Sequence, residues 1–219
     1  MDVNIKTEEL RSEGLVLVLS SPSGCGKTTV AGVLLRDERN NLVRSISVTT
    51  RAPRAGEENA KDYFFVSEEE FLKLRDSGKL IEHAKVFDNY YGIPRDFVEE
   101  NRKKGVNTLL VIDWQGALKL MKIMRESVVS VFIIPPSMEE LRRRLHNREN
   151  GRSVAVDSRL REAPFEITHC YEYDYVIVNE EIGDTADKIG CILRAEGMKT
   201  SRQTLLSRFI KENFSVLPR

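Results

Sequence analysis

The chain has 219 residues, of which 41% are hydrophobic and 31% charged, and 34 Lys and Arg balance 34 Asp and Glu to a formal net charge of zero. This balance gives no overall attraction to nucleic acid or acidic membranes, and no apolar run approaches the roughly 18 residues of a membrane span. The three cysteines (Cys25, Cys170 and Cys191) lack paired spacing and residues 1–13 lack an apolar signal segment, so we expect one compact cytoplasmic domain with inserted parts.

Strand-like and helix-like patterns alternate along most of the chain. In chain order we predict a strand over 15–20, a helix over 27–36, a strand over 44–50, a loop over 51–62, a strand over 63–67, a helix over 67–78, a strand over 80–87, a helix over 93–105, strands over 108–113 and 129–134, a helix over 137–149, a strand over 173–178 and a helix over 184–196. Several strand runs are apolar at every position, as in strands buried on both faces. An α/β fold with a parallel sheet flanked by helices is therefore expected.

Two segments depart from this alternation. Residues 47–91 contain several short strand patterns and predict a small, mostly β insertion. Residues 198–219 form a basic tail in which TLLSRFIKENF is weakly amphipathic, and this pattern predicts a surface helix.

The stretch SPSGCGKTTV follows the first strand and is close to the phosphate-loop pattern G-x-x-x-x-G-K-[ST], with Ser21 in place of the first glycine. Gly24 and Gly26 allow backbone N–H groups to converge on phosphate oxygens. Lys27 would reach the β- and γ-phosphates of a nucleotide, and the Thr28 hydroxyl would bind Mg²⁺. The alternative is a glycine turn at a helix start that binds no ligand.

Two basic clusters follow the phosphate loop. Arg51 and Arg54 stand three residues apart in the polar loop, and Arg144 and Arg148 lie four apart on one predicted helix face. Arginine binds phosphate through a planar fork, so each cluster is a candidate anion site. Taken alone, each cluster is more typical of a solvated charged surface.

Together with these clusters, the strings LIEHAKVFDNYYGIP, VIDWQGA, PPSMEELRRRL and YDYVIVNE resemble the guanylate kinase family from about residue 15 to 194. The resemblance implies a P-loop kinase fold over 14–196, with core segments 14–46 and 92–196, a β-rich GMP-binding lobe over about 47–91, a helical lid over about 147–158, an N-terminal extension over 1–13 and a tail over 197–219. It implies transfer of the γ-phosphate of ATP to GMP, and to dGMP, with Mg²⁺ as cofactor and ADP released. It implies no nucleic-acid or membrane partner, and it leaves the oligomeric state open.

The resemblance also implies roles at matching positions. The implied catalytic residues are Lys27, Arg51, Arg148 and Arg159. Those implied to bind ATP are Ser21, Ser23, Gly24, Cys25, Gly26, Lys27, Thr28, Thr29, Arg144 and Asn179, with Thr28 on Mg²⁺. Those implied to bind GMP are Ser47, Arg51, Arg54, Tyr63, Glu82, Tyr91 and Asp113.

The chemistry of the two substrates agrees with these roles. Guanine presents two adjacent donors, N1–H and the N2 amine, to one carboxylate such as Glu82, whereas adenine would leave that carboxylate unpaired. The acceptor oxygen of GMP is already anionic, so positioning and charge neutralisation suffice without a general base. Other interpretations stay open for two residues: Cys25 as a small packing residue, and Asn179 as a strand-end residue that caps a loop. Arg142 and Arg143 match no family position and are predicted to lie on the surface.

Four positions depart from the family pattern. Val111 stands where an aspartate is expected near Mg²⁺, and Asp113, on the same strand face, is the candidate to compensate. Ile93 replaces a hydroxyl residue near the base, Ala60 replaces a common glycine, and the lid segment lacks the usual acidic run. We expect these departures to change the rate and the substrate affinity more than the type of reaction.

Two alternative functions remain for such a chain. Guanylate kinase-like domains of scaffold proteins bind peptides, but they typically lose the loop lysine, which is present here as Lys27. A kinase for another nucleoside monophosphate is the second alternative, and Glu82 with Ser47 argues against it.

Overall fold

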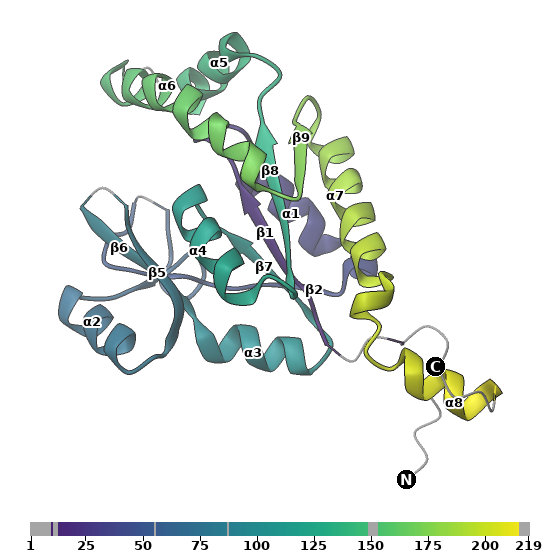
Figure 1. Ribbon diagram of the computed structural model, residues 1–219. Helices are drawn as coiled ribbons and strands as arrows, with labels where there is room; N and C mark the ends of the chain where they lie inside the picture. The colour runs from purple at the N-terminus through teal and green to yellow at the C-terminus, as the bar shows by residue number, and fades with distance from the viewer. Residues whose placement is uncertain (1–9, 11–12, 55, 87, 149–152, 215–219) are drawn as a thin grey trace.

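The computed structural model describes residues 10, 13–54, 56–86, 88–148 and 153–214, which form two sheets and the helices around them (Figure 1). The larger sheet has five parallel strands in the order β2-β7-β1-β8-β9. Its strands are β1 (Val16–Ser20), β2 (Leu42–Arg44), β7 (Asn107–Val111), β8 (Val128–Ile134) and β9 (Tyr175–Val178).

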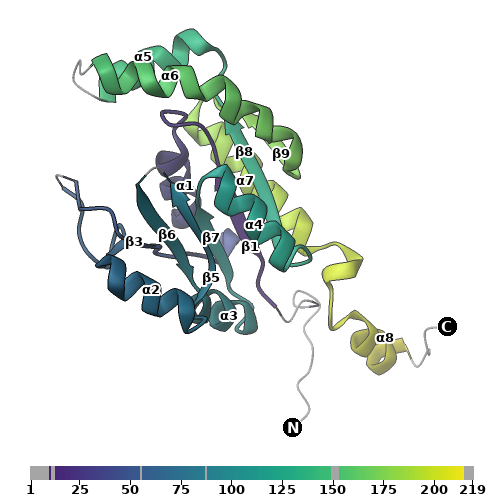
Figure 2. The ribbon, with the colours of Figure 1, turned by 60° about the vertical axis from the view of Figure 1, so that its left-hand side comes forward.

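Helices cover both faces of this sheet. The helices on its faces are α1 (Lys27–Arg36), α3 (Arg95–Lys103), α4 (Trp114–Met124) and α7 (Ile182–Gly197), and two further helices are α5 (Met138–Arg148) and α6 (Ser153–Thr168). One buried cluster joins the sheet to α1 and α7, and another joins the opposite face to α3 and α4. In Figures 1 and 2, α5 and α6 lie beyond the end of the sheet at which β1 and β8 finish. The expected α/β fold with a parallel sheet flanked by helices is confirmed.

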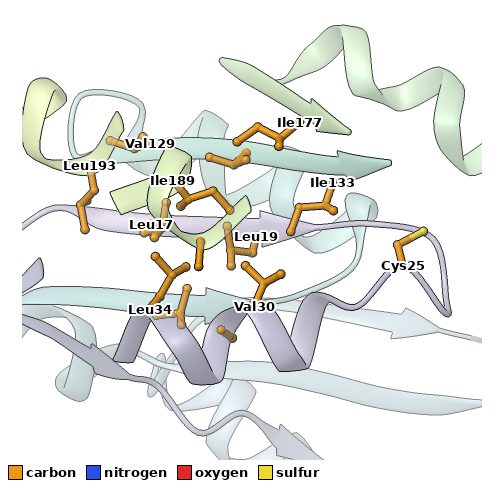
Figure 3. Close-up of a cluster of buried hydrophobic side chains, with 14 of the residues drawn as sticks. Leu17, Leu19, Cys25, Val30, Leu34, Val129, Ile133, Ile177, Ile189 and Leu193 are labelled. Atoms are coloured by element: carbon orange, nitrogen blue, oxygen red, sulfur yellow. The ribbon is translucent and has the colours of Figure 1, made fainter. Parts of the chain in front are cut away.

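Strand β1 shows why the apolar runs are continuous. Leu17 and Leu19 pack into the cluster with α1 and α7 (Figure 3), whereas Val16 and Val18 pack into the cluster on the other face. All four are fully buried, and each such side chain contributes about 1.5–3 kcal/mol relative to an exposed one. Both faces of the strand therefore need apolar residues, and the strand is held where the phosphate loop begins.

The second sheet has four strands in the order β4-β3-β6-β5. They are β3 (Val48–Thr49), β4 (Phe64–Phe65), β5 (Leu80–Val86) and β6 (Asn89–Pro94), with helix α2 (Glu68–Asp76) packed beside them. The pairs β3–β6 and β5–β6 are antiparallel, and β3–β4 is parallel. Val48, Phe71 and Leu80 form its small core, so this lobe has a packing centre separate from the larger sheet.

Several sequence predictions differ from the structure. The single strand expected over 44–50 is wrong, because the chain crosses between the sheets there: β2 ends at Arg44 and pairs with β7, and β3 begins at Val48 and pairs with β6. Strand β6 and helix α4 were not predicted, and the long helix α6, which contains Pro164, continues past the helical lid expected over about 147–158 and ends at Thr168. Strand β6 depends on its pairing with β3 and β5 more than on a local pattern.

The remaining elements lie at turns and in the tail. Short 3₁₀ helices cover Glu38–Asn40, His169–Glu172 and Thr200–Arg202, and the predicted tail helix is α8 (Leu206–Phe214). Helix α8 lies past the end of α7, away from both sheets, and none of its residues is buried (Figure 2). Among the described helices, none is long and apolar enough to cross a membrane.

Candidate active site

The loop between β1 and α1 has a backbone that only glycine fits at two positions. Gly24 and Gly26 have φ values of 92° and 85°, in the left-handed region that side chains disfavour. A Cβ at Gly24 would lie 2.8 Å from a Leu145 methyl, and one at Gly26 would lie 2.7 Å from Asn179 Nδ2. No side chain caps the start of α1, so its first N–H groups are available to an anion.

A cleft of about 930 Å³ opens over this loop, within the size range of nucleotide-sized ligand sites. It is lined by Ser21, Pro22, Ser23, Gly24, Cys25, Gly26, Lys27, Thr28, Thr29, Tyr63, Asp113, Glu140, Arg143, Arg144, Glu166, Glu180, Glu181 and Ile182. Every residue expected to bind ATP is therefore at the cleft, except Asn179. Arg143 is exposed, as predicted, and it also lines the cleft.

Two loop side chains have contrasting environments. Lys27 Nζ donates a hydrogen bond to the carbonyl of Ile112 at 3.2 Å. Burial lowers the pKa of Lys27, and the charges of Asp113 and Glu166 oppose that shift. Burial raises the pKa of the Cys25 thiol to about 12, so this cysteine is a protonated packing residue in the core.

Asn179 bonds to the phosphate loop, and Arg144 bonds to the backbone of Asn179. The Asn179 side chain is fully buried; its Nδ2 donates to the Cys25 carbonyl at 2.7 Å, and its Oδ1 accepts from the Thr185 hydroxyl at 2.9 Å. Its amide groups are thus engaged within the protein, as in the loop-capping interpretation. Arg144 Nε donates to Glu140 at 2.7 Å, and Nη2 donates to the Asn179 carbonyl at 3.1 Å.

A second cavity, of about 260 Å³, lies between the larger sheet and the small lobe. It is lined by Lys27, Thr28, Arg44, Ser47, Tyr63, Glu82, Ala84, Val86, Tyr91, Gly92, Ile93, Val111, Ile112, Asp113 and Gly116. Five of the residues expected to bind GMP are in this set. Lys27, Thr28, Tyr63 and Asp113 line both the cleft and the cavity, so the two hollows meet at the phosphate loop.

Glu82 is the buried carboxylate of the second cavity. The residue is 6% exposed, and its Oε1 has no hydrogen-bond partner in the described part of the chain. Burial raises the pKa of Glu82 to about 7, with Lys119 opposing the shift and Asp113 adding to it. A Cβ at Gly116 would come within 3.1 Å of Glu82 Oε2. Asp113 caps α4, since its Oδ1 accepts from the Gly116 N–H at 2.9 Å.

Arg51 is held near Tyr63 by a carboxylate from its own loop. Its Nη2 lies 2.9 Å from both Oε1 and Oε2 of Glu57, and its Nη1 donates to the carbonyl of Ala52 at 2.7 Å. The guanidinium stands 5.3 Å from the ring centre of Tyr63, which is 6.1 Å from the ring of Tyr91. The expected phosphate-binding side chains Arg51, Tyr63 and Tyr91 are thus brought together.

A third hollow connects three distant segments. It is lined by Ser23 of the phosphate loop, Arg54 of the small lobe, and Arg159, Glu162 and Glu166 of α6. Ser23 and Glu166 also line the large cleft. Arg148 ends α5, and its side chain lies outside the described residues, as do residues 149–152 of the expected lid.

The positions that depart from the family pattern have specific surroundings. Val111, at the end of β7, lines the second cavity and packs against the core. Ile93 is 1% exposed and lines the same cavity. Ala60 has a φ of 63°, so a residue with a side chain occupies a backbone conformation suited to the glycine common there.

Sequence reasoning missed several charged residues at the site, among them Arg44, Glu57, Lys119 and Glu166. Glu57 holds Arg51, Lys119 lies 3.9 Å from Glu82, and Arg44 and Glu166 line the hollows. None follows a local spacing rule. By contrast, the i,i+4 pair of Glu140 and Arg144 could have been found from helix spacing.

Comparisons with known proteins agree with this geometry. Residues 13–196 match the family model described as guanylate kinase. Curated guanylate kinases from Anaplasma phagocytophilum (strain HZ) and Wolbachia pipientis wMel are 61% and 54% identical, over 94% and 89% of this chain and 99% and 96% of their own lengths. The crystal structure of guanylate kinase from Anaplasma phagocytophilum superposes with a TM-score of 0.80 and 55% identity, covering 95% of this chain and 100% of that one. The chain therefore belongs to the guanylate kinase family, and it catalyses the ATP-dependent phosphorylation of GMP to GDP.

Proposed function

We propose that the large cleft binds the phosphates of ATP and that the second cavity binds GMP. The observation that carries this assignment is the meeting of the two hollows at Lys27, Thr28, Tyr63 and Asp113. A γ-phosphate over the loop and an acceptor phosphate near Tyr63 would then face each other across Lys27. Such an arrangement supplies the positioning on which phosphoryl transfer depends.

The acceptor is recognised at both ends. Glu82 accepts the two guanine donors, with Ser47 and Asp113 beside the base, and burial of the carboxylate sharpens the penalty for adenine. Arg51 and Tyr91 bind the phosphate of the acceptor. Because base and phosphate carry the recognition, dGMP is also a substrate.

Positively charged side chains assist the transfer of the phosphoryl group. Lys27, Arg144 and Arg159 neutralise charge on the transferring phosphoryl group, and Arg54 assists from the lobe side. Arg148 acts with them by its family position. Cys25 acts through its backbone in the phosphate loop. Asn179 fixes that backbone through its hydrogen bond to the Cys25 carbonyl and so supports the part of the cleft that binds adenine.

Mg²⁺ is the proposed cofactor, held by the hydroxyl of Thr28 together with ATP oxygens and water. Thr28 is exposed and lines both hollows. No cluster of three His, Cys, Asp or Glu side chains suited to a metal occurs in the described residues. This donor set fits Mg²⁺, which keeps several waters and is usually bound through substrate phosphates. When bound, the ion neutralises β- and γ-phosphate charge.

Closure of the small lobe over 47–91 and of the lid over 147–158 is part of the proposal. The third hollow supports it, because Arg54 of the small lobe and Arg159, which directly follows the lid, line a common space. Closure would exclude water that could otherwise hydrolyse ATP. A cytoplasmic location remains a prediction from composition.

The deciding experiment replaces Glu82 by Gln and measures kcat/KM for GMP and for AMP. The amide keeps the size of the side chain but offers a donor where guanine also has one. We expect a loss of about 10²-fold or more for GMP and a narrower gap between the two nucleotides. An unchanged ratio would remove Glu82 from the base site.

A further inference from the structure

Glu82 is buried in the guanine cavity with one cation close to its carboxylate. Lys119, on α4, places its Nζ 3.9 Å from Glu82 Oε1. The same Nζ donates a hydrogen bond to the carbonyl of His83 at 3.1 Å, which fixes the ammonium next to the strand that carries Glu82. The Lys119 side chain is 55% exposed, whereas that of Glu82 is 5% exposed.

This arrangement matters because guanine needs the ionised form of the carboxylate. A protonated carboxyl would present its own O–H to N1–H and the N2 amine, and one of the three donors would lack an acceptor. Burial favours the protonated form unless a positive charge opposes it. Glu82 Oε1 lacks a hydrogen-bond partner in the part of the protein described, so a charge at short range is the means available.

We propose that Lys119 is a positioning residue of the guanine site, whose ammonium, anchored on the His83 carbonyl, keeps the Glu82 carboxylate ionised and turned toward the base. The inference rests on the proposed role of Glu82 and adds Lys119, which does not line the cavity itself. In this proposal Lys119 does not contact the substrate. It acts through Glu82 alone.

The other charges around Glu82 do not replace Lys119. Asp113, before α4, is negative and favours the protonated carboxyl. The remaining charged or titratable groups that line the cavity are Lys27 of α1, Arg44 of β2, Tyr63 beside β4 and Tyr91 of β6. His83 and Lys85 lie on the other face of β5, and Arg75 and Asp76 of α2 lie near His83. Arg95 of α3 donates hydrogen bonds to the carbonyls of Gly78 and Leu80 and to the carboxylate of Glu99. Among the charged groups, Lys119 lowers the pKa of Glu82 and Asp113 raises it.

The direction of the pH effect follows from these charges. The pKa of Glu82 is already raised to about 7, so the ionised form is lost as the pH falls through neutrality. Removing the positive charge of Lys119 raises that pKa further. Because about half of the Lys119 side chain is in solvent, we expect its removal to raise the pKa of Glu82 by about one pH unit. At pH 6.5 this shift lowers kcat/KM for GMP about eightfold, whereas at pH 8.5 the change stays below about twofold.

The experiment compares Lys119→Met with the wild-type enzyme between pH 6 and 9, using kcat/KM for GMP at saturating ATP. Lys119→Arg keeps the charge and should restore the wild-type profile. Lys122→Met removes an exposed positive charge from the same helix and serves as the matched control. The KM for ATP should stay unchanged in all variants. Ionisation of GMP itself affects every pH profile equally, because every variant receives the same substrate, so it does not alter the comparison between variants.

A direct measurement separates this inference from the proposed role of Glu82. The ¹³C shift of the Glu82 carboxyl, followed against pH in the unliganded protein, should show a higher midpoint in Lys119→Met. An unmoved midpoint would overturn the inference even if Glu82→Gln destroys GMP selectivity. A raised midpoint with an unmoved kcat/KM profile would overturn it as well, and would also refute the ionised Glu82 as the group that reads guanine.

Discussion

Glu57 offers a sharp test of how the phosphate-binding arginines are placed. Its two carboxylate oxygens each lie 2.9 Å from Arg51 Nη2, and its Oε2 also accepts from the backbone N–H of Arg54 at 2.7 Å. The side chains of Glu57 and Arg51 are 21% and 14% exposed. Although burial raises it, the pKa of Glu57 is held below its usual range by the hydrogen bonds from Arg54 and Arg51. The change to test is Glu57→Gln, which keeps the shape but removes the charge.

The expected effect can be estimated from these contacts. Hydrogen bonds to charged groups contribute about 1.5–3 kcal/mol, and solvent reduces this for a partly exposed pair. We therefore expect a loss of about 1–2 kcal/mol in holding Arg51, which corresponds to a roughly 5- to 30-fold higher KM for GMP. The KM for ATP should not change, because neither Arg51 nor Glu57 lines the large cleft.

Initial rates with varied GMP at saturating ATP measure the effect, with the melting temperature as a control for folding. Glu58→Gln is the matched variant, since Glu58 is the next residue and pairs in solvent with Lys61. A KM for GMP equal to wild type would refute the reasoning. A lower KM would mean that Glu57 competes with the phosphate for Arg51 rather than orienting it.

Three further predictions test other parts of the site. Lys27→Met should lower kcat by about 10²-fold or more without lowering the melting temperature, and a variant that keeps a tenth of the wild-type kcat would contradict its role. Ala60→Gly should raise the free energy of unfolding in urea by about 0.5–1 kcal/mol, because the left-handed backbone at Ala60 disfavours a Cβ. An unchanged free energy of unfolding would contradict a left-handed conformation at this position. Val111→Asp should lower the Mg²⁺ concentration for half-maximal activity while reducing the melting temperature by burying a carboxylate, and superimposable Mg²⁺ titrations would mean that Val111 is a harmless departure.

Local signals in the sequence account for the parts of the fold that were predicted well. The capping box at the start of α2 has both expected bonds, with the Ser67 side chain accepting from the Glu70 N–H and the Glu70 side chain accepting from the Ser67 N–H. The apolar run before the phosphate loop is the central strand β1, and α1 begins at Lys27 as predicted. These features depend on residues a few positions apart, so the sequence specifies them directly.

Features that depend on distant segments could not be predicted in this way. Lys119 and Glu82 meet only because α4 packs against β5. The predicted strand over 44–50 divides because β2 and β3 find partners more than forty residues further along the chain. Helix α4 is an intermediate case, since Ala117, Leu120 and Met121 are buried at helical spacing, and this pattern would have predicted it.

The contacts of the basic side chains give the site a common design. Arg51 is paired with Glu57 and Arg144 with Glu140, while Glu166 opposes the lowered pKa of Lys27. Cations gathered for two substrates would repel one another in the unliganded protein, and these carboxylates offset that repulsion while they orient the donors. A site balanced in this way attracts nucleotides weakly at long range. Its affinity therefore depends on donors already in position, and removing a carboxylate should weaken substrate binding even though it makes the site more positive.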